Sequence, residues 1–127
     1  MADYYSQFSF IIPLTPEQTD HLLDTLMDKE ALKHIFEDPE YVNLGVAKDD
    51  DGLWISSEID GNTNDAVALL EHAVQYYHLP PMGFEWGCTC SKPRLDGFGG
   101  GAVWTDGKTT EYTHTSEWLR NHESQQC

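Results

Sequence analysis

The spacing of hydrophobic positions changes several times along the chain, and each change predicts a new element. The segment QFSFIIPL alternates at every second position, which predicts a strand over residues 7–14. In the next segment, TPEQTDHLLDTLMD, leucines stand three and four positions apart, which predicts an amphipathic helix over Thr15–Asp28. Thr15 suits the N-cap, Pro16 the first helical position and Gln18 the third position of a capping box.

The two sides of this predicted helix differ in chemistry. At about 100° per residue, Leu22, Leu23 and Leu26 fall opposite a stripe of acids, so we expect the leucines to face a core and the acids to face water. The following residues, KEALKHIFEDPEY, predict a further helical turn or two that ends before Pro39, within one bent helix or as a second helix. The acids of the stripe are Glu17, Asp20, Asp24 and Asp28.

The rest of the chain repeats this change between strand and helix patterns. Residues 41–48 and 53–59 predict two strands, joined by a tight turn at Asp49–Gly52. The segment DAVALLEHAVQYYH predicts a second long helix, capped by Thr63 or Asn64. The later elements are a strand over residues 82–91, a loop over 92–101, a hairpin of residues 102–105 and 108–114 around Asp106-Gly107, and a short helix that begins at Thr115 or Ser116.

The first six of these elements follow the order β-α-β-β-α-β. This order is typical of the ferredoxin-like split β-α-β arrangement. We therefore predict one α+β domain over residues 1–127, with an antiparallel sheet, two helices on one face and an added C-terminal β-hairpin. A length of 127 residues suits a single domain, and 39% hydrophobic residues are enough to build a core.

The net charge of the chain limits the kinds of molecule that it can bind. The net charge is −15, and it is uneven: residues 1–75 hold 16 acids and three lysines, whereas residues 76–127 hold six acids and four basic residues. A field of this sign repels nucleic acid and anionic membranes, and it attracts basic surfaces. We therefore expect a Lys/Arg-rich protein or nucleoprotein complex as the partner, with no direct binding of nucleic acid or membrane.

The carboxylates expected to meet such a partner lie in three segments. Along a helix, acids one turn apart are about 6 Å from each other, whereas one DNA strand carries a charge about every 3.4 Å. Imitation of phosphates would therefore need acids from outside the helix as well, and a plain solvated helix face is the alternative explanation of the stripe. The candidate partner-binding residues are Glu17, Asp20, Asp24, Asp28, Glu37, Asp38, Glu40, Asp49, Asp50 and Asp51.

Candidate chemical sites are weak by comparison. Cys88 and Cys90 would point the same way on a strand, about 7 Å apart, and could ligate a metal with His114 or His78. The usual structural spacing is C-x₂₋₄-C, however, and no second cysteine pair exists, so we predict no metal and no cofactor. We expect instead two small apolar residues on a buried strand face.

The other motifs do not indicate an enzyme either. The glycine-rich run over residues 97–101 lacks the Gly-Lys-Ser/Thr ending of a P-loop, and we expect it to allow a bulge or a close backbone approach. The Asp49–Asp51 turn lacks the twelve-residue EF-hand pattern, and no Ser/His/Asp or Cys/His set is recognisable. We therefore predict a protein without enzymatic activity.

Two further observations indicate a cytoplasmic protein. The N-terminal residues MADYYSQ are polar and acidic, and no apolar run reaches the length of a signal-peptide core or a membrane span. The chain has three cysteines, an odd number, which fits reduced thiols better than a disulfide framework.

A short stretch of the C-terminal half resembles a motif of small phage and mobile-element proteins whose function is not established. The matching residues are Phe84-Glu85-Trp86, Thr89-Cys90-Ser91, Pro93-Arg94 and Phe98-Gly99-Gly100-Gly101-Ala102. In its size and acidity the chain is also similar, as a class, to the nucleic-acid-mimicking anti-restriction and anti-CRISPR inhibitors of phages. That likeness implies an inhibitor that occupies a basic nucleic-acid-binding surface of a host defence complex, and it assigns no residues.

Two alternatives to this interpretation stay open. One is a small enzyme or ligand-binding domain built around an aromatic surface of Trp86, Trp104 and Tyr112. The other is a structural or immunity-type subunit that pairs through its sheet edge or hairpin, for which a homodimer is an expected state.

Overall fold

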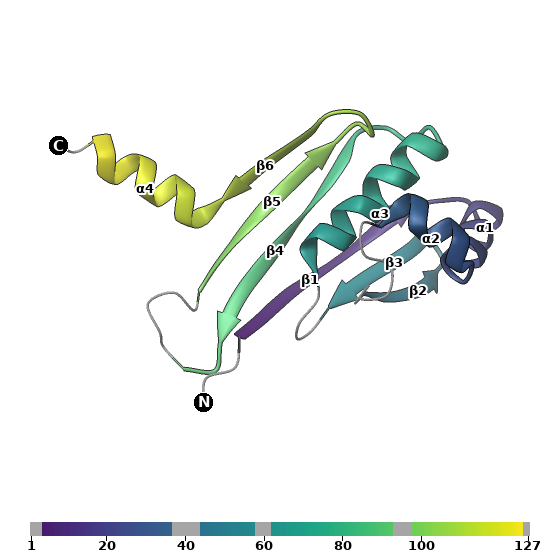
Figure 1. Cartoon of the computed structure of the whole chain (residues 1–127), viewed down its shortest axis with the longest axis horizontal. Coiled ribbons are helices and arrows are strands. Elements are labelled where there is room, and N and C mark those ends of the chain that lie inside the picture. Colours follow the sequence, from purple (N-terminus) through teal and green to yellow (C-terminus); the bar gives the residue numbers. More distant parts are fainter. Residues whose placement is uncertain (1–3, 37–43, 58–61, 93–97, 126–127) are drawn as a thin grey trace.

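The computed structural model describes residues 4–36, 44–57, 62–92 and 98–125. These residues form six strands and four helices, which Figure 1 shows in sequence colours. The elements are β1 (Tyr4–Pro13), α1 (Pro16–Leu26), α2 (Lys29–Ile35), β2 (Gly45–Asp49), β3 (Gly52–Ser57), α3 (Thr63–Tyr76), β4 (Met82–Cys90), β5 (Gly99–Thr105), β6 (Thr110–His114) and α4 (Thr115–Gln125).

The strands form one antiparallel sheet in the order β2-β3-β1-β4-β5-β6. Strand β1 is central, with Phe8 opposite Ser57 of β3 and opposite Trp86 of β4. Strands β2 and β6 lie at the two edges. The predicted combination of helices with one antiparallel sheet is therefore confirmed.

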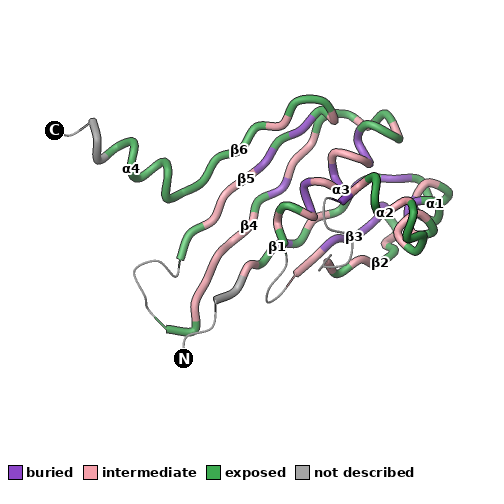
Figure 2. The backbone as a smooth tube through the Cα atoms, in the orientation of Figure 1, coloured by how far each residue is buried: buried purple, intermediate pink, exposed green. Residues whose placement is uncertain are grey.

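One face of the sheet carries the core. Helices α1, α2 and α3 lie on the same side of the sheet, and buried positions concentrate there (Figures 1 and 2). The alternation predicted for β1 is confirmed, because Phe8 and Ile12 are buried whereas Ile11 is partly exposed on the other face. Helix α3 contributes the largest set of buried side chains: Ala66, Val67, Leu69, Leu70, Ala73 and Val74.

Helix α1 begins as the sequence predicts. Thr15 is its N-cap, and the capping box is complete: the Gln18 backbone N–H donates to Thr15 Oγ1 over 3.2 Å, and the Thr15 N–H donates to Gln18 Oε1 over 3.0 Å. Leu22 is fully buried, and Leu23 and Leu26 are partly buried against the same core. The capping signal and the leucine stripe therefore both predicted the start and the orientation of this helix correctly.

The end of this helix differs from the prediction. Helix α1 stops at Leu26, and Asp28 has extended backbone angles and caps a separate helix, α2. The Asp28 carboxylate accepts a hydrogen bond from the Glu30 backbone N–H over 3.0 Å. Asp28 is therefore not part of the helical stripe. The break allows α2 to leave α1 at an angle and to bring Phe36, its C-cap, into the core.

The glycine-rich run was expected to be a loop, but Gly99, Gly100 and Gly101 open strand β5 and pair with β4. A Cβ atom on Gly101 would lie 2.4 Å from Cζ2 of Trp86, so only glycine fits beside that indole. The expectation of a close backbone approach is therefore confirmed, whereas the loop assignment over these three residues was wrong.

The second face of the sheet and the C-terminal helix have no covering layer among the described residues. Ile11, Trp54 and Trp104 lie on this open face and are partly exposed. Helix α4 projects away from the body of the sheet beyond β6 (Figure 1). No helix in the described part of the chain is both long enough and apolar enough to cross a membrane.

Candidate acidic interface

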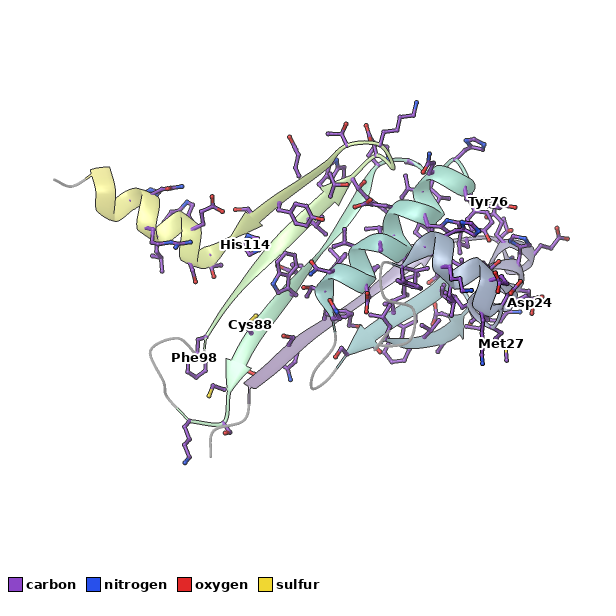
Figure 3. The ribbon with its side chains drawn as sticks, viewed as in Figure 1. Asp24, Met27, Tyr76, Cys88, Phe98 and His114 are labelled. Carbon is purple, nitrogen blue, oxygen red and sulfur yellow. The ribbon has the colours of Figure 1, made fainter. Side chains whose placement is uncertain are left out.

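The predicted carboxylates that the structure describes gather where α1 meets the turn between β2 and β3. Seven of the ten are described, and the other three, Glu37, Asp38 and Glu40, lie outside the described residues. Figure 3 shows Asp24 at this end of the molecule, far from α4. We refer to Glu17, Asp20, Asp24 and the turn residues Asp49, Asp50 and Asp51 together as the acidic end.

Helix α1 supplies the first half of the acidic end. Glu17, Asp20 and Asp24 are exposed and follow one another at intervals of three and four residues. Because Leu22 on the opposite side is fully buried, the helix cannot rotate these carboxylates away from water without losing its core contact. Glu17 also lies in the first turn of α1, where the helix dipole favours a negative charge.

The β2–β3 turn supplies the second half, and the sheet register brings it to α1. Gly52 of β3 pairs with Pro13, only three residues before the helix begins. The Leu14 backbone N–H donates to the Asp51 carbonyl over 3.4 Å, which places the turn beside the N-terminal end of α1. Within the turn, the Asp51 N–H donates to Asp49 Oδ2 over 3.1 Å. Asp50 and Asp51 are exposed.

One carboxylate of the acidic end is paired. Lys48 Nζ lies 2.8 Å from Asp20 Oδ1, so a cation from edge strand β2 reaches the acidic face of α1. Both side chains are at least half exposed, and exposed pairs of this kind contribute only about 0–1 kcal/mol to stability. No local sequence pattern indicates this pair, because the two residues are 28 positions apart and their contact depends on the sheet register.

The other described candidate carboxylates differ in whether they accept hydrogen bonds within the chain. Asp49 and Asp28 accept backbone hydrogen bonds that hold a turn and a helix start. The carboxylates of Glu17, Asp24, Asp50 and Asp51 make no hydrogen bond or ion pair with any residue that the structure describes. These four are therefore the side chains of the acidic end that are available to a cation on another molecule.

A cluster of rings borders the acidic end and was missed by the sequence analysis. His21 on α1 places Nδ1 2.7 Å from the Tyr77 hydroxyl oxygen, and its ring stacks on Tyr76 at a centroid distance of 5.5 Å. The ring of His72 stacks on Tyr76 as well, also at 5.5 Å. The cluster thus joins α1 to the C-terminal end of α3, and helical spacing between His72 and Tyr76 was the available sequence signal.

Burial shifts the pKa of two side chains in this ring cluster, His72 and Tyr77. It lowers the pKa of the His72 imidazole, and the nearby His21 lowers it further. Burial also raises the pKa of the Tyr77 hydroxyl, with a smaller contribution from Tyr76. His72 is therefore neutral at pH 7 and brings no positive charge to the neighbouring carboxylates.

The sites considered for other chemistry do not assemble among the described residues. Cys88 and Cys90 are free thiols of intermediate exposure, and the described residues contain no group of three or more His, Cys, Asp or Glu side chains that could hold a metal ion. The aromatic surface expected for a ligand-binding domain is divided: by register, Trp86 and Tyr112 lie on the helix side of the sheet and Trp104 on the open side.

Hollows lie near the C-terminal hairpin instead. One, of about 260 Å³, lies between the start of α3 and the sheet, where Trp86 and His114 meet Thr63. A second, of about 490 Å³, is an open groove between α4 and the sheet, with Trp118 and Leu119 on its helix side. A third, of about 640 Å³, is an open depression along β5 and β6. None of these three contains a residue of the acidic end.

Comparison of the chain with protein-family models, with curated proteins and with solved structures finds no match.

Proposed function

We propose that this protein is a non-enzymatic, acidic interaction protein that binds a Lys/Arg-rich surface of a protein or nucleoprotein complex. Its acidic end competes there with the phosphates of nucleic acid. The observation that carries the proposal is the meeting of two separate acidic segments, α1 and the β2–β3 turn, at one end of the molecule. Among their side chains, Glu17, Asp24, Asp50 and Asp51 have no partner within the described chain.

Charge density supports competition with nucleic acid more than a helix alone would. Acids one helical turn apart give only about half the charge density of a DNA strand. The Leu14–Asp51 backbone contact adds the turn to the same surface, so the acidic end gains carboxylates beside the N-terminal turn of α1. Only Lys48 is seen to neutralise one of these carboxylates in the described residues.

The class of inhibitor that fits this surface is the nucleic-acid mimic of phages, of the anti-restriction or anti-CRISPR kind, acting in the cytoplasm of a host cell. A small acidic protein on a rigid α+β scaffold suits that role, because a preorganised surface loses little entropy on binding.

We also infer a ferredoxin-like arrangement for β1 to β4. The strand order β2-β3-β1-β4, with α1 and α2 after β1 and with α3 after β3, supports it.

The experiment is a pull-down from bacterial lysate with the tagged protein, eluted along a salt gradient and followed by identification of the bound proteins. The proposal predicts a basic nucleic-acid-binding protein that elutes at moderate salt, because exposed ion pairs weaken as salt screens them. Added DNA or RNA should displace the tagged protein from it. A partner whose binding is indifferent to both salt and nucleic acid would overturn the proposal.

A pair of matched variants separates the acidic end from net charge. Glu17→Gln/Asp24→Asn removes two unpaired charges of the acidic end and should weaken binding to the captured partner by about tenfold, at about 0.5–1 kcal/mol per exposed charge contact. Glu71→Gln/Glu85→Gln removes the same charge from elsewhere on the fold and should leave binding unchanged. Equal losses in both variants would show that only the total charge matters.

A further inference from the structure

Strand β6 is an unpaired sheet edge that runs without interruption into α4. Its residues pair with β5 on one side only, from Thr105↔Thr110 to Gly101↔His114. Helix α4 begins at the next residue, Thr115, whose hydroxyl donates to the Gly100 carbonyl over 3.3 Å. Any molecule that pairs with the free edge of β6 therefore lies directly beside α4.

Helix α4 lacks a core of its own. Its described side chains are all exposed, and Trp118 and Leu119 retain 57% and 55% of their accessible surface. Among the described aromatic rings, Trp118 contacts a neighbour on the same helix, His122, at a centroid distance of 4.0 Å, and its other side borders an open groove. Isolated helices of about 11 residues are marginal in water, so a stable α4 requires apolar contact from another surface.

We propose that this surface belongs to a second copy of the chain. Two copies pair antiparallel along β6, and α4 of each copy packs on the open sheet face of the other, where Trp104 is exposed. The groove of about 490 Å³ between α4 and the sheet is the space into which the second copy fits. This proposal does not rest on the proposed function.

The register along β6 favours self-pairing. A two-fold axis through Tyr112, the middle residue of the five, pairs every residue of the strand. Glu111 then lies opposite Thr113 of the second copy, and Thr110 lies opposite His114, so no two carboxylates face each other. Tyr112, which is half exposed, packs against Tyr112 of the second copy.

The distribution of charge also favours contact between two copies through the C-terminal half of the chain. Residues 76–127 hold six acids and four basic residues, against 16 acids and three lysines in residues 1–75. Strands β2 and β6 are opposite edges of the sheet, so pairing along β6 keeps the two acidic ends apart. A contact through any surface near the acidic end would instead bring like charges together.

The exposed apolar area is of the size that such a contact needs. Trp104, Tyr112 and Trp118 are each about half exposed. Since an aromatic side chain buries about 150–250 Å², covering these three removes on the order of 300 Å² from water on each copy. Backbone pairing and the rest of α4 add to this area, toward the ~800 Å² per partner of a standard interface.

Sedimentation equilibrium of the full chain, from micromolar to near-millimolar concentration, tests the proposal. Wild type should show twice the mass of one chain, in equilibrium with monomer at low concentration. Trp118→Ser/Leu119→Ser removes no core contact and should fold normally, but its dimer should dissociate about thirtyfold more readily. A monomeric wild type overturns the proposal, and so does a variant that dimerises as tightly as wild type.

A second pair of variants tests the register. Thr113 is exposed on β6 and is predicted to face Glu111 of the second copy. Thr113→Lys should tighten the dimer several-fold, and Thr113→Glu should weaken it by a similar factor, because each dimer contains this contact twice. Equal dissociation constants for the two variants would contradict the pairing along β6.

Discussion

Lys48 Nζ contacts Asp20 Oδ1 at 2.8 Å and thereby joins edge strand β2 to the acidic face of α1. The contact has two opposite consequences for a surface that is proposed to bind cations. It fixes the position of one carboxylate, and it places a positive charge among the others.

Replacing Lys48 by Gln should tighten binding to a basic partner. The substitution removes the cation that pairs with the acidic end among the described residues, and it leaves the Asp20 carboxylate available. The free energy of unfolding should change by less than about 1 kcal/mol, because both side chains are exposed. Binding at two salt concentrations, together with urea unfolding, measures both effects. Weaker binding by the variant would mean that Lys48 itself contacts the partner.

Leu22→Ala should destabilise the fold by about 2–5 kcal/mol. Leu22 is fully buried and is the side chain that holds the inner face of α1 against the core. Met27→Ala serves as the control, since Met27 is 86% exposed at the end of the same helix and its loss should cost less than about 0.5 kcal/mol. Urea unfolding of both variants tests the assignment, which similar losses would contradict.

Gly101→Ala should destabilise the β4–β5 contact by about 1–3 kcal/mol. The added Cβ would lie 2.4 Å from Cζ2 of Trp86 and 2.5 Å from the Thr113 carbonyl oxygen, so the indole or the strand must move. Gly87→Ala is the matched control, because its Cβ would meet nothing within 4 Å. Thermal unfolding followed by tryptophan fluorescence compares the two. A Gly101→Ala variant as stable as Gly87→Ala would show that the indole has room to shift.

His72 should make stability depend on pH below neutrality. Burial, followed by the nearby His21, lowers the pKa of His72 below its ordinary value of 6.5. The unfolded chain therefore binds a proton at a higher pH than the folded chain does. The contribution of His72 to the free energy of unfolding is therefore fully present above pH 6.5. It is lost as the pH falls from there through the lowered pKa of His72 in the folded chain.

Urea unfolding across this pH range isolates the histidine. The free energy of unfolding should fall with pH more steeply for wild type than for His72→Gln, which cannot take up the proton. The His21→Gln variant is an informative control. It removes the smaller cause of the shift and should retain most of the wild-type slope. Identical slopes for wild type and His72→Gln would show that the ring is not buried against Tyr76 as described.

Local sequence signals predicted those features that depend on neighbours along the chain. Thr15, Gln18 and the leucines of α1 act within two helical turns, so the start of the helix and its buried side followed from spacing alone. The end of the helix did not. Asp28 was a member of the acidic stripe by spacing, but it caps α2, a separate helix whose C-cap, Phe36, is buried in the core.

Local patterns in the sequence therefore predicted the type and order of most elements and the side of α1 that faces the core. Which acids lie near one another depends instead on tertiary contacts. The pairing of Pro13 with Gly52 brings the β2–β3 turn to α1, and the contact of Lys48 with Asp20 neutralises one carboxylate there. Pairing with β4 likewise makes the glycines of β5 part of a strand, in which the Trp86 indole lies beside Gly101. These features depend on sheet register between distant residues, which no local pattern encodes.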